Sequence, residues 1–63
     1  MIPHEGDVFV GTAVQVEPFG TFIEHPQGAH GLLHGETVEV GARVEVRVLH
    51  SDAETRRFSL TTV

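Results

Sequence analysis

Apolar and polar residues alternate along the segment from Val38 to Val48. Valine or alanine occupies every even position, and all but one of the odd positions carry a charged residue. A period of two is typical of a strand with one buried face, whereas a helix would spread these side chains around its circumference. Valine is also a poor helix former. Because Gly41 lies inside the run and marks where strand pairing begins, the pattern predicts a strand from about Arg43 to Leu49.

Four further segments have the alternation of short strands. The first runs from Asp7 to Val16, and its alternation breaks at Gly11-Thr12-Ala13, which predicts a bulge or sharp bend there. The others run from Phe19 to Glu24, from Gly31 to His34 and from Arg57 to Thr62. Five short strands, with no helical pattern longer than a turn, predict an all-β closed barrel, because closure removes exposed sheet edges.

Length and composition limit the classes of protein to consider. A chain of 63 residues suffices for one domain, so we expect a single domain over residues 1–63. The absence of Cys excludes disulfides, thiolate metal sites and a Cys nucleophile. No apolar run has the length of a membrane span, and the first residues lack the pattern of a signal peptide. We therefore expect a cytoplasmic location.

The charge balance is acidic. Nine Asp and Glu residues stand against four Arg and no Lys, which gives a formal net charge of −5 with His neutral. This balance argues against tight, non-specific binding to a polyanion. Protonation of all five His would bring the formal charge to zero, so attraction to phosphate should strengthen in mildly acidic solution.

Five segments together carry a resemblance to a known family. They are GDVFVGTA at 6–13, FGTFI at 19–23, GAHGLLH at 28–34, VGARVEVRV at 40–48, and the segment from Asp52 that ends in RFSLT at 57–61. In this order they resemble the S1 RNA-binding domain, over about residues 5 to 62. The resemblance implies that the five strands form the OB-fold barrel of that family.

The sequence departs from the family pattern in three respects. Gly35 to Glu39 makes up nearly all of the connection between the third and fourth strands, so the helical turn usual there should be missing or replaced. His30 and Glu36 stand where the family often has an acidic residue and Ser, respectively. The basic residues that commonly ring the binding face of the family are sparse.

The resemblance implies that single-stranded nucleic acid binds across one face of the barrel. The residues at the matching positions are Phe19, Phe22, His34, Asp52 and Arg57. Exposed aromatic rings stack on unpaired bases at about 1–3 kcal/mol per base, and a nearby Arg can contact phosphate. If Gly20 lets the backbone turn closely, both phenyl rings and His34 form one flat platform. Arg57 points away from the face that Phe58 and Leu60 share. We expect single-stranded RNA to bind by stacking, with low sequence specificity.

Each of these residues has a structural alternative. Two of the four Phe residues of the chain belong to the set, and a small barrel needs one or two phenyl rings in its core. His34 and Arg57 have the alternative of ordinary solvated surface residues. For Asp52, the capping of a turn is the favoured alternative. Phe9 on the first strand has two open orientations, one of which would extend the platform.

Metal and catalytic sites find little support in the sequence. His25, His30 and His34 could ligate zinc, but their spacing is not that of a helical or knuckle site and no Cys completes it. No Ser-His-Asp arrangement, phosphate-binding glycine loop or recognisable carboxylate pair is present. We expect no metal, no cofactor and no enzymatic activity.

A second function remains open beside RNA binding. The acidic composition and the short connection also suit a protein-interaction OB module of a ribosome- or transcription-associated complex that has lost nucleic-acid binding. Its partner would be the ribosome or a basic protein, and the chain itself is expected to be a monomer. The position of the acidic residues relative to Phe22 discriminates the two, because carboxylates around that face would repel RNA.

Overall fold

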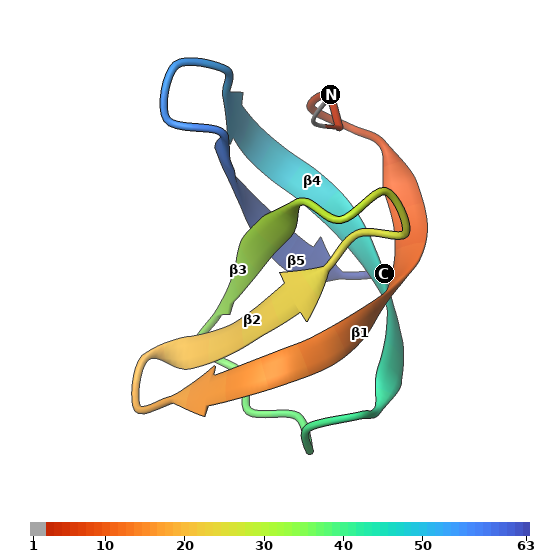
Figure 1. Ribbon diagram of the computed structural model, residues 1–63, viewed down its shortest axis with the longest axis vertical. Helices are drawn as coiled ribbons and strands as arrows, with labels where there is room; N and C mark the ends of the chain where they lie inside the picture. The colour runs from red at the N-terminus through yellow and green to blue at the C-terminus, as the bar shows by residue number, and fades with distance from the viewer. Residues whose placement is uncertain (1–2) are drawn as a thin grey trace.

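Five β-strands close into a barrel in the computed structural model, which describes residues 3–63 (Figure 1). They are β1 (Val8–Glu17), β2 (Gly20–Glu24), β3 (His30–His34), β4 (Arg43–Asp52) and β5 (Arg57–Thr62). The order around the barrel is β1-β2-β3-β5-β4, and β4 pairs with β1 to close it. All pairs are antiparallel except β3 with β5. The predicted all-β closed barrel is confirmed. The described residues form no helix long and apolar enough to cross a membrane.

The strand bounds follow the predicted ones closely, with one larger difference. β4 continues to Asp52, three residues beyond the predicted end at Leu49. The extension pairs with the start of β5, where Asp52 lies opposite Arg57. At its other end β4 begins at Arg43 as predicted, because Gly41 has a φ of 93° and turns the chain before it.

Seven apolar side chains fill the barrel. Among residues 3–63 the core residues are Ala13, Ile23, Leu33, Val46, Val48, Phe58 and Leu60, and each of the five strands contributes at least one of them. The valine face of β4 and the Phe58 and Leu60 face of β5 therefore point inward, as the alternation indicates. A core of this size is small, so each of these side chains carries a large share of the apolar burial.

β1 has the opposite orientation from the one its valines would suggest. Val8 and Val10 are 45% and 41% exposed, while Phe9, Gly11 and Ala13 face the interior. Glycine is required at position 11, because a Cβ there would overlap the Ile23 side chain and the carbonyl oxygen of Glu24. The close approach of β2 thus selects the small residues of β1 for the inner face and leaves its valines outside.

Two irregularities interrupt the antiparallel ladders. The register between β1 and β2 shifts between Ala13 and Gln15, next to the predicted bend. A second shift, which the sequence did not suggest, lies between Val48 and His50 in the pairing of β4 with β5. Each bulge adds one residue to its strand, and so changes which following side chains point outward.

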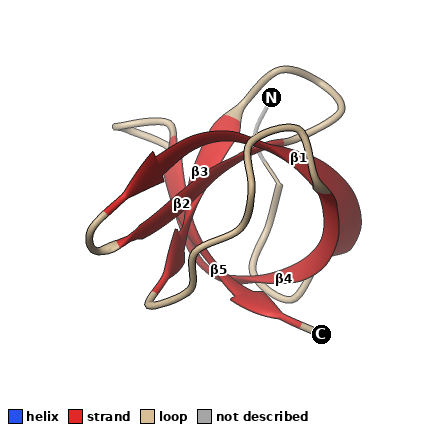
Figure 2. Ribbon diagram, turned by 90° about the horizontal axis from the view of Figure 1, so that it is seen from below, coloured by secondary structure: helices blue, strands red, loops and turns tan. Residues whose placement is uncertain are grey.

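The short connection from β3 to β4 crosses one end of the barrel without a helix (Figure 2). The buried hydroxyl of Thr21 on β2 holds it there, since Oγ1 donates to the carbonyl of Glu36 at 2.8 Å and accepts from the Val38 amide at 3.0 Å. Val38 packs partly against the core. This tethered segment replaces the helical turn that is usual in the family.

Thr21→Val is expected to lower the free energy of unfolding by about 1–3 kcal/mol. The two side chains have nearly the same shape, but valine leaves the Val38 amide and the Glu36 carbonyl without their buried partner. Urea denaturation of the two proteins measures the difference. Thr21→Ser retains the hydroxyl and is the control for the hydrogen bonds. A Thr21→Val protein as stable as the wild type would contradict this role.

Candidate nucleic-acid interface

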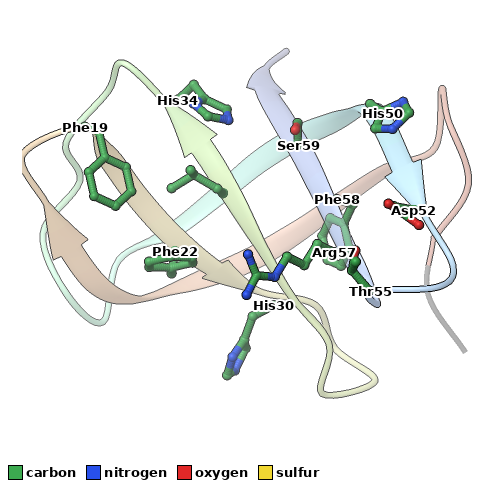
Figure 3. A pocket seen from close by; sticks show the side chains of 11 residues that line it. Phe19, Phe22, His30, His34, His50, Asp52, Thr55, Arg57, Phe58 and Ser59 are labelled. Atoms are coloured by element: carbon green, nitrogen blue, oxygen red, sulfur yellow. The ribbon is translucent and has the colours of Figure 1, made fainter.

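A groove of about 620 Å³ lies on the outer face of the barrel over β2, β3, β5 and β4 (Figure 3). The residues that line it are Phe19, Phe22, His30, Leu32, His34, His50, Asp52, Thr55, Arg57, Phe58 and Ser59. All five residues predicted for the site are in this set. The fold thus brings together positions from the beginning, middle and end of the chain.

Strand register explains why these side chains meet. Phe22 pairs with Leu32, Leu32 with Ser59, and Ser59 with His50, so one row of groove residues crosses four neighbouring strands. The parallel pairing of β3 with β5 is essential to this row, because it joins segments that are far apart in sequence. The row passes from an aromatic ring on β2 to a hydroxyl and an imidazole on β5 and β4. The groove therefore has an aromatic half and a polar half.

Phe19 and Phe22 form the aromatic half. Phe19 lies in the turn between β1 and β2 and is 55% exposed, while Phe22 on β2 is half-buried, and neither ring belongs to the core. Their centroids lie 6.4 Å apart with an angle of 90° between the planes. The expected flat platform is therefore wrong in its geometry, since the rings share one surface but stand edge to face. Each can offer a face to a different base.

Gly20 allows this arrangement by its close contact with β3. A Cβ at Gly20 would overlap the carbonyl oxygen of Leu33, so only glycine permits the two strands to approach here. His34, the residue paired with Gly20, is exposed at the end of β3 and lines the groove next to the aromatic half.

Asp52 and Arg57 are paired residues of the β4–β5 hairpin, and the Arg57 guanidinium extends toward Phe22 and away from Asp52 (Figure 3). Oδ1 of Asp52 accepts a hydrogen bond of 3.0 Å from the amide of Glu54, which is the turn-capping contact weighed as its alternative role. Asp52 nevertheless lines the groove. The side chain of Arg57 is exposed and, in the part of the chain that the structure describes, makes no ion pair. Its guanidinium is available to a ligand.

The acidic residues lie largely outside the groove. Among residues 3–63, Asp52 is the one carboxylate in the groove lining. The other eight are Glu5, Asp7, Glu17, Glu24, Glu36, Glu39, Glu45 and Glu54. The lining also holds Arg57 and three of the five His residues. The net charge of the chain is thus a poor guide to the charge that a ligand in the groove would meet.

Six lining positions were not predicted as binding residues. They are His30, Leu32, His50, Thr55, Phe58 and Ser59. Ser59 could have been found from the sequence, because it follows Arg57 by two residues on the same face of a strand. His50 could not, because the alternation of β4 assigns it to the inner face. Phe9, whose orientation was open, packs against the core with its ring 6.2 Å from that of Phe58.

Two of the three histidines considered for zinc have other contacts. Nδ1 of His25 accepts from the Gln27 amide at 3.0 Å, and its ring lies edge-on to Phe9. Nε2 of His30 lies 3.4 Å from a carboxylate oxygen of Glu24. Within residues 3–63, no group of three or more potential ligands is arranged to hold a metal ion.

Comparison with known proteins agrees with this fold. The family model of the S1 RNA binding domain matches residues 2–62. The small ribosomal subunit protein bS1 of Staphylococcus aureus is 37% identical over 92% of this chain, which spans only 18% of that protein. Among solved structures, an uncharacterized protein from Methanocaldococcus jannaschii superposes with a TM-score of 0.88 at 21% identity, over 100% of this chain and 96% of that one. GSP13 from Bacillus subtilis superposes with a TM-score of 0.84 at 26% identity, over 98% and 58%. The chain therefore belongs to the S1 RNA-binding domain family, whose five-stranded OB fold it has and whose general function is RNA binding.

Proposed function

We propose that the chain binds single-stranded RNA in the groove by base stacking, with low sequence specificity. The observation that carries this proposal is that Phe19 and Phe22 line a groove whose lining, among residues 3–63, contains one of the nine carboxylates. Unpaired bases present flat faces to such rings, and every base has one, which makes stacking tolerant of sequence. Single-stranded RNA leaves these faces free, whereas a duplex does not.

The polar half of the groove suits the sugar-phosphate backbone. Arg57 on β5 supplies a fixed positive charge, and the hydroxyl of Ser59 can donate to a phosphate oxygen or a ribose hydroxyl. The remaining arginines do not line the groove, so few phosphates are neutralised. Stacking rather than counterion release therefore supplies most of the affinity, which we expect to be modest.

The salt dependence of RNA binding should be shallow. One Arg in the groove implies release of about one counterion, so the logarithm of the association constant should fall with a slope of about −0.7 against the logarithm of salt concentration. Fluorescence anisotropy with a labelled single-stranded oligonucleotide, at several salt concentrations near pH 8, measures the slope. A slope several times steeper would show that phosphate contacts dominate.

An NMR shift map locates the contact in the same experiment series. Amide shifts on adding the oligonucleotide should concentrate on β2, β3 and the β4–β5 hairpin, and spare the outer side of β1. Shifts on β1 alone, or no shifts, would contradict the proposed interface.

A second candidate is a protein-interaction module. The outward row of valines on β1 favours it, because Val8, Val10, Val14 and Val16 are all more than a third exposed on a surface outside the groove. A pull-down after nuclease treatment that recovers one specific basic protein would support this function. Since the curated relatives are ribosomal proteins, we propose the ribosome in the cytoplasm as the place where a monomer of this domain meets either partner.

A further inference from the structure

The bulge in β4 determines where His50 points. Val46 and Val48 are buried, so a regular strand would direct the next even residue, His50, into the barrel. The register shift between Val48 and His50 adds Leu49 as an extra residue, and His50 then pairs with Ser59 and faces outward. Leu49 is exposed as a result. The bulge thus places the imidazole of His50 in the groove and not in the core.

His50 completes the groove at the end opposite the aromatic rings. His34, Ser59 and His50 follow one side of the groove, and Asp52 lies below His50 (Figure 3). Phe22 and His50 are separated by three strand spacings, or roughly 14 Å. A group that contacts His50 therefore belongs to the RNA backbone beyond the nucleotide that stacks on Phe22. No motif of the family resemblance includes position 50.

We propose that His50 contacts a phosphate of the bound RNA and that protonation of its imidazole strengthens this contact. The inference rests on the proposed function of the groove. Imidazole changes charge between about pH 5 and pH 8, and a protonated imidazole donates a charge-assisted hydrogen bond to phosphate. Ser59, its partner across the β4–β5 pairing, offers a hydroxyl to the same part of the backbone.

Few charged groups surround His50, so protonation of a groove imidazole changes the charge of the groove lining substantially. Apart from its histidines, the groove lining has two charged residues, Asp52 on β4 and Arg57 on β5. Their charges cancel, so the formal charge of the lining is zero when its histidines are neutral. His34 and His30 come from β3 and line the same groove, and a carboxylate oxygen of Glu24 lies 3.4 Å from the ring of His30. The N-terminal segment reaches β4 through the hydrogen bond from Ser51 to the carbonyl of Pro3, but none of its described residues lines the groove. Each imidazole that protonates in the lining adds one positive charge where a phosphate would lie.

The test compares variants of His50 with a matched histidine outside the groove. The probe is a single-stranded RNA of about 12 nucleotides, within the site size of an OB fold, and affinities are measured at about pH 6 and about pH 8. His50→Ala should lose about 3- to 10-fold in affinity at the lower pH and less than about 2-fold at the higher pH. His50→Arg, charged at both pH values, should bind more tightly than the wild type at the higher pH. His4→Ala, which removes an exposed histidine that does not line the groove, should behave as the wild type.

The outcomes separate this inference from the proposed function. If His50→Ala matches the wild type at both pH values while Phe22→Ala weakens binding, the RNA site stands and the role of His50 is overturned. If His4→Ala and His50→Ala lose the same affinity, the effect belongs to net charge and not to a contact, which also overturns it. If the wild type binds no RNA at either pH, both the proposed function and this inference fail. An amide NMR spectrum with the chemical-shift dispersion of a folded β-protein establishes that each variant is folded.

Discussion

Phe22→Ala is expected to weaken the binding of single-stranded RNA by about 5- to 150-fold, the equivalent of one lost stacking contact of about 1–3 kcal/mol. The Phe22 ring is half-buried in the groove and edge-on to Phe19. Its removal therefore takes away one stacking face and the support of the other ring. Fluorescence anisotropy at moderate salt measures the change, since the stacking term depends little on ionic strength.

Two control variants separate stacking from folding. Phe22→Trp retains an aromatic face and should retain binding, while Val10→Ala truncates an exposed apolar residue of β1 outside the groove and should leave binding unchanged. Amide spectra of the three proteins check that the barrel is intact. Equal affinity of Phe22→Ala and the wild type would remove base stacking from the proposed function.

Gly31→Ala is expected to destabilise the barrel by about 1–3 kcal/mol, with a fall in Tm of about 5–20 °C. A Cβ at position 31 would overlap the ring of Phe58, which is 3% exposed and cannot move freely. The ring would have to shift toward Phe9, whose centroid is 6.2 Å away, or into the groove that Phe58 also lines. Thermal unfolding followed by circular dichroism measures the loss.

A double-mutant cycle tests that cause. Phe58→Leu removes Cε2 and Cζ, two of the three ring atoms that the new Cβ would meet, so Gly31→Ala should cost less in the Phe58→Leu background than in the wild type. Gly28→Ala is the comparison variant, because a Cβ there meets nothing within 4 Å and its cost comes only from the φ of 97°. Additive costs of Gly31→Ala and Phe58→Leu would show that the ring contact is not responsible.

Local alternation predicted much of the fold because the inner face of this barrel is apolar. Along β4 and β5 the inward residues are Val46, Val48, Phe58 and Leu60, and a strand exposes every second side chain to the same side. β1 did not follow the same rule. Its inner face is made of Gly11 and Ala13 at the contact with β2, and its valines stayed outside. Steric fit between strands outweighed side-chain hydrophobicity there.

The candidate site was predictable in its residues but not in its geometry. The resemblance to the S1 family named Phe19, Phe22, His34, Asp52 and Arg57, and these residues all line one groove. The perpendicular angle between the two phenyl rings was not predictable, because strand alternation indicates which side of the sheet a side chain is on but not the orientation of its ring. The dual position of Asp52, as turn cap and groove residue, also needed the hairpin geometry.

The sequence by itself determined the all-β class, the five strands, the inward faces of β4 and β5 and the acidic composition. Those properties follow from the order of neighbouring residues, because successive side chains of a strand point to opposite sides and alternating apolar residues therefore share one face. Only the tertiary structure decided that eight of the nine carboxylates are absent from the groove lining and that His50 belongs to it. Both depend on closure of the barrel, on the parallel pairing of β3 with β5 and on the bulge in β4. These features arise from contacts between segments far apart in the sequence, so no local pattern predicts them.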